Sequence, residues 1–195
     1  MQPPATSFVL GYHGCDESVA KDLLDGGEFR ASTNDYDRLG QGRYCWESNP
    51  LRGLEWARFL ASGAISGRKV KNPTVVGAVI NLGHCLDLTT SQGTQLVTEA
   101  HRSLVTMSEA AGNQLPGNKA NPPLRRLDCA VMEHLHQIRT ELSLAPFDSV
   151  RGLFPEGEPL YPEAGFLDRT HVQICVRNPE CIIGLFKVRD EFLRP

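Results

Sequence analysis

The segment that constrains the fold most is residues 74–82, with the sequence TVVGAVINL. It is rich in β-branched residues, which favour extended backbone, and Gly83 follows it as a natural end. This is the strongest strand prediction in the chain. The fold must therefore contain a β-sheet, and the rest of the sequence has to supply its other strands and the helices that cover it.

Shorter strands and helices are predicted around this segment. The other predicted strands are residues 7–12, 43–47, 85–88, 170–176 and 181–188, and the predicted helices are residues 16–25, 50–62, 92–111 and 124–142. Residues 28–43 form a polar loop, and residues 145–168, rich in Pro and Gly, are predicted to be irregular. Asn178-Pro179 favours a hairpin-like reversal between the last two strands. We predict an α+β fold in one domain over residues 1–195.

Composition narrows the class of protein. Hydrophobic residues make up 41% and charged residues 22% of the chain, enough for a packed core. The net charge of -3 disfavours a strongly basic nucleic-acid binder and leaves open only a local basic patch around Lys69, Lys71, Arg125 and Arg126. We expect no signal peptide and no membrane association, because no apolar run approaches the roughly 20 residues that span a bilayer. The six cysteines form no CxxC motif, and we expect reduced, mostly buried thiols in a cytoplasmic protein.

Most of the Tyr and Trp residues gather in one stretch. Five of the six are Tyr12, Tyr36, Tyr44, Trp46 and Trp56. The same stretch holds His13-Gly14 and residues 39–43 (LGQGR), whose Gly-x-Gly lets the backbone approach a ligand closely. Aromatic rings beside such a loop can stack on a flat heterocycle, which predicts a nucleotide or nicotinamide pocket. The alternative is a strand-end histidine, glycines that serve a tight turn, and tryptophans that belong to the core.

The order of these residues resembles a known superfamily. Residues 12–14 (Tyr-His-Gly) end the first predicted strand, residues 42–44 (Gly-Arg-Tyr) open the second, and Trp56 stands twelve positions later on a helix. This order resembles the diphtheria-toxin-like ADP-ribosyltransferases, the superfamily that also contains the poly-ADP-ribose polymerases. The resemblance covers about residues 8–57 and again residues 170–176.

The resemblance implies a fold and a set of contacts with NAD, the co-substrate. The fold would be a split β-sandwich of two packed, mainly antiparallel sheets with flanking helices. His13 would hold a ribose hydroxyl of NAD, and the backbone of Gly14 would pair with the nicotinamide amide. Tyr44 and Trp56 would stack on the two sides of the nicotinamide ring. The other predicted NAD-binding residues are Ser32, Gly42 and Arg151.

The third motif departs from the family. There the superfamily has a glutamate that grips the 2′-hydroxyl of the nicotinamide ribose, and its charge steadies the oxocarbenium-like state. Residues 170–175 (THVQIC) place Gln173 at this position, so the predicted catalytic residues are His13, Tyr44 and Gln173. A glutamine can hydrogen-bond but carries no charge. Unless another group supplies the missing charge, its loss should raise the activation free energy by about 3–4 kcal/mol.

Three explanations stay open for this departure. The domain binds NAD without fast chemistry, a reactive acceptor needs less help, or a different carboxylate supplies the charge. The candidate carboxylates are Asp35, Asp37, Glu47, Asp148, Glu156 and Glu163.

Arginines near the motifs are candidates for the NAD pyrophosphate. Arg151 lies in the predicted irregular segment, and its forked guanidinium suits phosphate oxygens. The alternative is a surface arginine paired with Asp148 or Glu156. Arg38 and Arg43, beside the Gly-rich loop, are alternative phosphate partners.

A metal site is not predicted. Residues 133–136 (EHLH) lack the HExxH pattern, and histidines two apart point to different faces of a helix. We therefore expect these histidines to be structural or exposed to solvent.

The function that follows is an NAD-dependent mono-ADP-ribosyltransferase. It would cleave NAD, release nicotinamide and transfer ADP-ribose to a macromolecular acceptor, either protein or nucleic acid. A small enzyme of this kind resembles a bacterial toxin or effector that an inhibitory partner protein keeps in check. With water as acceptor it would be an NAD glycohydrolase. The alternative is a catalytically weak or inactive module that binds NAD or ADP-ribose.

Overall fold

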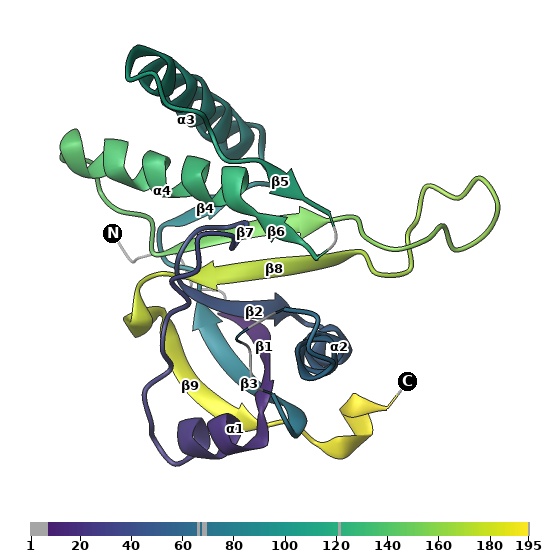
Figure 1. Ribbon diagram of the computed structural model, residues 1–195. Helices are drawn as coiled ribbons and strands as arrows, with labels where there is room; N and C mark the ends of the chain where they lie inside the picture. The colour runs from purple at the N-terminus through teal and green to yellow at the C-terminus, as the bar shows by residue number, and fades with distance from the viewer. Residues whose placement is uncertain (1–7, 66, 68–69, 121, 195) are drawn as a thin grey trace.

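The predicted strand at residues 74–82 forms as β3 (Pro73–Asn81), which pairs with one neighbour on each side. It belongs to a seven-stranded sheet in the order β4-β7-β8-β2-β1-β3-β9 (Figure 1). The computed structural model describes residues 8–65, 67, 70–120 and 122–194. The other strands of the sheet are β1 (Phe8–Asp16), β2 (Arg43–Glu47), β4 (Cys85–Asp87), β7 (Ser149–Phe154), β8 (His171–Val176) and β9 (Ile182–Lys187). The strands β5 (Asn118–Lys119) and β6 (Leu124–Arg125) form a separate two-stranded sheet.

The sheet nearly divides between β1 and β2. These strands pair only at Gly11–Glu47 and Tyr12–Trp46, whereas β1 pairs with β3 along its whole length. Beyond Tyr12, β1 therefore follows β3 while β2 follows β8. The α+β class is confirmed. The two sheets expected from the resemblance are joined here in one sheet that opens at this point, which we call the split.

Helices cover both halves of the sheet. The helices are α1 (Glu17–Leu24), α2 (Pro50–Ala61), α3 (Ser91–Ala110) and α4 (Arg126–Glu141). In Figure 1, α3 and α4 lie beside the β4-β7-β8 half and α2 lies beside β1 and β2. Asp16 is the N-cap of α1, since its side chain accepts a hydrogen bond from the Ser18 N–H at 3.0 Å. The core under α3 and α4 includes Leu86, Val131 and Phe147.

Three sequence predictions about the strands are wrong. The first strand runs to Asp16 rather than ending at residue 12, because β3 continues to pair with it. Residues 149–154, predicted as irregular, form β7, whose register is set by β8 and not by any local alternation. The last two strands are not a hairpin. The short 3-10 turn η1 (Pro179–Cys181) leads the chain from β8 to β9 at the opposite edge, beside β3.

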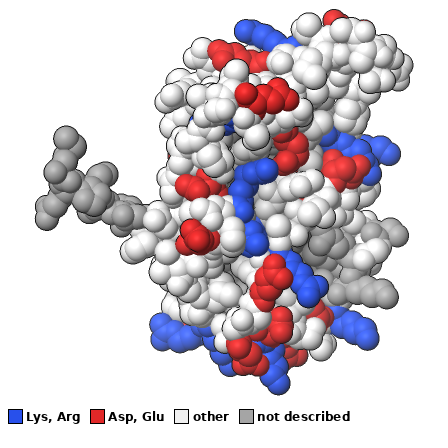
Figure 2. All heavy atoms as spheres, turned by 90° about the vertical axis from the view of Figure 1, so that its left-hand side faces the viewer, with Lys and Arg blue, Asp and Glu red and all other residues white. Residues whose placement is uncertain are grey.

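The expectation for the cysteines holds. All six cysteines are free thiols, five of them buried and Cys85 half-buried. Burial raises the pKa of the Cys45 thiol to about 12. Acidic and basic side chains are interspersed on the face seen in Figure 2, without a broad basic field. Within the described ranges, no helix has the length and apolar character to cross a bilayer.

Candidate functional site

The split between β1 and β2 opens into a cavity of about 520 Å³. This volume is within the range of small-molecule sites, roughly 300–1,000 Å³. Its walls come from β1, β2, β8, α2 and the loop before β2. Every predicted site residue except Arg151 lines it, namely His13, Gly14, Ser32, Gly42, Tyr44, Trp56 and Gln173. Positions 13 and 173 are far apart in sequence, and the sheet brings them into one cavity.

His13 bridges the split. Its Nδ1 lies 2.8 Å from the Tyr44 carbonyl oxygen, and because a carbonyl can only accept, the Nδ1 carries the proton. The imidazole also packs against Phe29, with ring centroids 4.7 Å apart. A side chain thus replaces the main-chain hydrogen bonds that β1 and β2 lose here, and this fixes the ring at the cavity wall.

Gly14 has a packing role that the sequence did not reveal. A Cβ atom at this position would lie 1.9 Å from the carbonyl oxygen of Gly53, so α2 can approach β1 only over a glycine. The contact holds α2, and with it Trp56, over the cavity. The same glycine is therefore required by the fold as well as predicted for the ligand.

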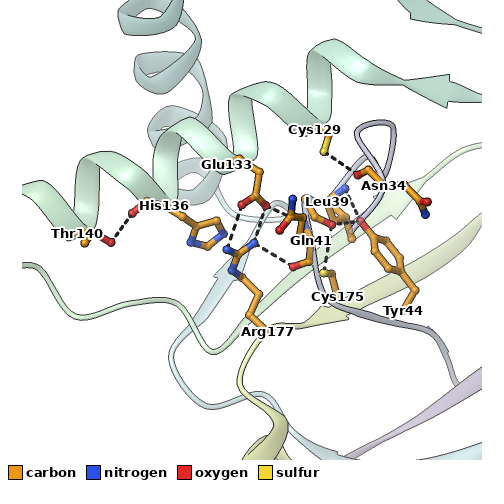
Figure 3. Close-up of polar contacts among 11 residues, drawn as sticks. Asn34, Leu39, Gln41, Tyr44, Cys129, Glu133, His136, Thr140, Cys175 and Arg177 are labelled. Carbon is orange, nitrogen blue, oxygen red and sulfur yellow. Dashed lines mark hydrogen bonds and ion pairs between the residues drawn. The ribbon is translucent and has the colours of Figure 1, made fainter. Parts of the chain in front are cut away.

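The hydroxyl of Tyr44 is already hydrogen-bonded inside the protein. The hydroxyl donates to the Gly40 carbonyl at 2.7 Å and accepts from the Leu39 N–H at 3.0 Å (Figure 3). Burial raises the phenol pKa well above its usual value. The side chain is consequently a neutral phenol whose orientation is fixed from both ends.

A second layer of contacts fixes the loop that holds Tyr44. The Gln41 N–H donates to Glu133 Oε1 on α4 at 2.7 Å. Arg177 donates to the Gln41 carbonyl at 3.0 Å and to Glu133 Oε1 at 2.7 Å (Figure 3). Burial alone would raise the pKa of the Glu133 carboxyl, but the bonds from Arg177 and the Gln41 amide outweigh it and the pKa is lowered. We call Glu133 and Arg177 the loop clamp; no motif in the sequence signals it.

Tryptophans form the wall beside Gln173. Trp46 is only 3% exposed and pairs with Gln173 across the β2–β8 ladder. Its ring centroid lies 6.0 Å from that of Trp56, which in turn stacks on Phe59 at 5.4 Å. The Trp46 Nε1 is buried, and the described residues offer it no hydrogen-bond partner. Trp46 was predicted only as part of the aromatic cluster, and the structure adds it to the cavity.

Arginines are abundant in the cavity wall, but Arg151 is not among them. The lining arginines are Arg30, Arg38, Arg43, Arg52 and Arg125. Arg151 lies on β7, where it binds Glu47 at 2.6 Å and Asp87 at 3.1 Å. Arg151 therefore lies neither in an irregular segment, as predicted, nor against Asp148 or Glu156, the alternative. The strand directs its side chain toward β2 and β4. Arg38 and Arg43, the alternative phosphate partners, do line the cavity.

The candidate carboxylates separate into two groups. Asp35 pairs with Arg126, and Glu47 is held by Arg151. Asp148 accepts hydrogen bonds from the His84 N–H and from Asn178. None of these lines the cavity, and neither does Glu163. Of the predicted set, Asp37 and Glu156 line it.

No metal-ligand cluster is found among the residues that the structure describes. His134 is buried on α4 and its Nε2 lies 3.0 Å from the Ser103 hydroxyl, a structural role. His136 packs edge-on against Phe147.

Comparisons of the chain with protein-family models, with curated proteins and with solved structures find no match. The superfamily named above is therefore a prediction that rests on the motif residues.

Proposed function

We propose that the chain is an NAD-dependent mono-ADP-ribosyltransferase whose active site is the cavity at the split. One observation carries the proposal. His13, Tyr44, Trp56 and Gln173 were singled out by motif order alone, and they line one cavity of about 520 Å³ although they come from β1, β2, α2 and β8. On this proposal the sheet is the split β-sandwich of the superfamily, with its two halves joined at the split.

The chemistry follows from the walls of the cavity. Tyr44 and Trp56 both line the cavity, and a nicotinamide ring would stack between their two rings. His13 and Gln173 would hydrogen-bond ribose hydroxyls, and lining arginines would meet the pyrophosphate. The bond between nicotinamide N1 and ribose C1′ would break, with its electron pair leaving on nicotinamide. The acceptor would then form the new bond to C1′ and lose a proton.

A second candidate function is favoured by Gln173. With an uncharged third motif, the domain would bind NAD or ADP-ribose with slow or no turnover, or would transfer ADP-ribose only to water as a glycohydrolase.

For the transferase function, we propose a cytoplasmic toxin or effector whose acceptor is a protein or a nucleic acid. Of the basic patch considered for nucleic acid (Lys69, Lys71, Arg125, Arg126), Arg125 lines the cavity and Lys69 lies outside the described residues.

Nicotinamide release from NAD by the purified protein tests the proposal. Tyr44→Ala and Trp56→Ala remove one ring face each and should each raise the KM for NAD. Phe192→Ala, which removes an exposed ring that does not line the cavity, is the matched control. If wild type binds NAD without releasing nicotinamide, the binding-module function is the right one. If NAD does not bind, both functions are refuted.

A further inference from the structure

Glu156 is a carboxylate in the cavity wall that none of the three motifs contains. It follows β7 and lines the same cavity as Gln173. Its carbonyl accepts a hydrogen bond from the Arg169 N–H at 3.0 Å, which extends the β7–β8 pairing past its last registered pair. Since Gln173 lies on β8, the backbone of Glu156 is fixed to the strand that carries the uncharged third motif.

Two arginines hold the Glu156 side chain in place. Arg38 forms an ion pair with Oε1 at 2.8 Å, and Arg52 donates a hydrogen bond to Oε2 at 3.1 Å. Arg38 comes from the loop before β2 and Arg52 from the first turn of α2, so the carboxylate is fixed by two separate elements. Each carboxylate oxygen has about two acceptor positions, and each arginine uses one. The Glu156 carboxylate is thus oriented from two sides, with acceptor capacity left over.

Unsatisfied polar atoms lie around this carboxylate. The Nε of Arg52 is buried, and so is the Nε2 of His171, and the described residues give neither a partner. The His171 Nδ1 donates to the Arg169 carbonyl at 2.8 Å, so its Nε2 is an unprotonated acceptor in the neutral ring. Burial lowers the pKa of His171, which keeps that ring neutral. Buried polar groups without partners are rare in proteins, and a polar ligand in the cavity would give these two atoms a partner.

The other carboxylates of the cavity are committed elsewhere. Asp16 accepts hydrogen bonds from the backbone N–H groups of Asn72 and Lys71, before β3, and of Ser18 in α1, and these bonds hold its pKa below the usual range. Asp37 accepts from the Asn34 side chain within the loop before β2. Glu156 is therefore the remaining carboxylate of the cavity that Gln173 also lines, and it follows β7, the strand that pairs with β8.

On the basis of the function proposed above, we propose that Glu156 is the catalytic carboxylate of this site and supplies the charge that Gln173 lacks. As the bond from C1′ to nicotinamide breaks, positive charge develops on the ribose, and a fixed anion in the wall stabilises it. An O–H or N–H group of the acceptor then forms the new bond to C1′. Its proton passes to the Glu156 carboxylate and from there to water, so that the carboxylate is regenerated.

The experiment compares Glu156→Gln with Glu55→Gln. Both variants remove a carboxylate that pairs with Arg52, but Glu55 is 48% exposed and does not line the cavity. Nicotinamide release from NAD gives kcat and KM, and quenching of the two tryptophans in the cavity wall gives the Kd for NAD. Thermal unfolding of each variant reports whether it is folded. Glu156→Asp, which keeps the charge, is the second variant.

We expect Glu156→Gln to lower kcat about 100-fold and to leave the Kd for NAD within about threefold. Glu55→Gln should stay within about twofold of wild type in both, and Glu156→Asp should retain more activity than Glu156→Gln. Adding Gln173→Glu to Glu156→Gln should restore kcat by about tenfold or more, because it returns a charge to the same cavity.

Two results separate this proposal from the function on which it is built. If wild type cleaves NAD and Glu156→Gln cleaves it equally well, Glu156 is not the catalytic carboxylate while the transferase proposal stands. The same holds if Asp37→Asn, and not Glu156→Gln, abolishes cleavage with NAD still bound. If wild type binds no NAD, the proposed function itself is refuted and this role goes with it.

Discussion

Gly40→Ala should destabilise the protein more than the same change at Gly63, although both glycines have nearly the same backbone conformation. Their φ angles are +81° and +77°, in the left-handed region where an L residue costs roughly 1–2 kcal/mol. Gly63 follows α2, and a Cβ atom there would meet nothing within 4 Å. Gly63→Ala therefore measures the backbone cost alone.

Gly40 adds a collision with the loop clamp. A Cβ atom there would lie 2.5 Å from Glu133 Oε1, the atom that accepts from both the Gln41 N–H and Arg177. Moving this oxygen weakens two charge-assisted hydrogen bonds, each a term of about 1.5–3 kcal/mol when fully buried. The Arg177 and Glu133 side chains are 23% and 31% exposed, so the combined loss is nearer about 1–2 kcal/mol.

The assay is urea or thermal unfolding of both variants beside wild type. Gly40→Ala should lose about 1–2 kcal/mol more than Gly63→Ala, or roughly 2–5 °C more in Tm. The Gly40→Ala, Glu133→Ala double variant should be less destabilised than the sum of its two single changes, since Glu133→Ala removes the atom that collides. Equal losses at the two glycines, or strict additivity in the double variant, would falsify the role assigned to the loop clamp.

Three further predictions follow from the contacts described. Tyr44→Phe keeps the ring face but leaves two hydrogen bonds of its hydroxyl unmade, so unfolding free energy should fall by about 1–3 kcal/mol in chemical denaturation; an unchanged midpoint would contradict the burial of that hydroxyl. Gly14→Ala forces a Cβ to within 1.9 Å of the Gly53 carbonyl oxygen, and should cost about 3 kcal/mol or more and lower the yield of folded protein. Burial lowers the pKa of His136 from 6.5 to about 4, so its neutral form contributes stability that is complete above pH 6.5 and is lost as the pH falls towards 4. His136→Phe should flatten the stability profile across this window, and an unchanged profile would rule out a buried neutral imidazole.

The sequence was sufficient to predict most helices and strands, but not which strands pair with one another. The strand at residues 43–47 and the helices were predicted close to their observed bounds, because caps such as Asp16 and the β-branched run of β3 act locally. β7 was missed because its six residues owe their extended form to β8, which begins seventeen positions after β7 ends. The periodicity of a short segment does not reveal its pairing with a strand so far along the chain.

The candidate site followed the same division. The motif order predicted His13, Tyr44 and Gln173 as parts of one site, and in the structure all three line the same cavity. Arg151 was misplaced because its role depended on a loop that is a strand. Glu133 and Arg177 could not have been found, since their pairing joins residues 44 positions apart without a motif to mark either. Long-range ion pairs of this kind appear only once the chain is folded.

The β1–β2 ladder is short, so few hydrogen bonds join the two parts of the sheet at the split. Two residue pairs, the hydrogen bond from the Ser48 N–H to the Leu10 carbonyl and the imidazole of His13 link β1 to β2, whereas the neighbouring β1–β3 ladder has nine registered pairs. In native-state hydrogen exchange the amides of β2 near the split should open with a lower free energy than those of β3. A molecule bound in the cavity would contact both parts of the sheet at once and so stabilise the split. Its affinity could then be measured from the slowing of amide exchange in β2 near the split, without any assay of turnover.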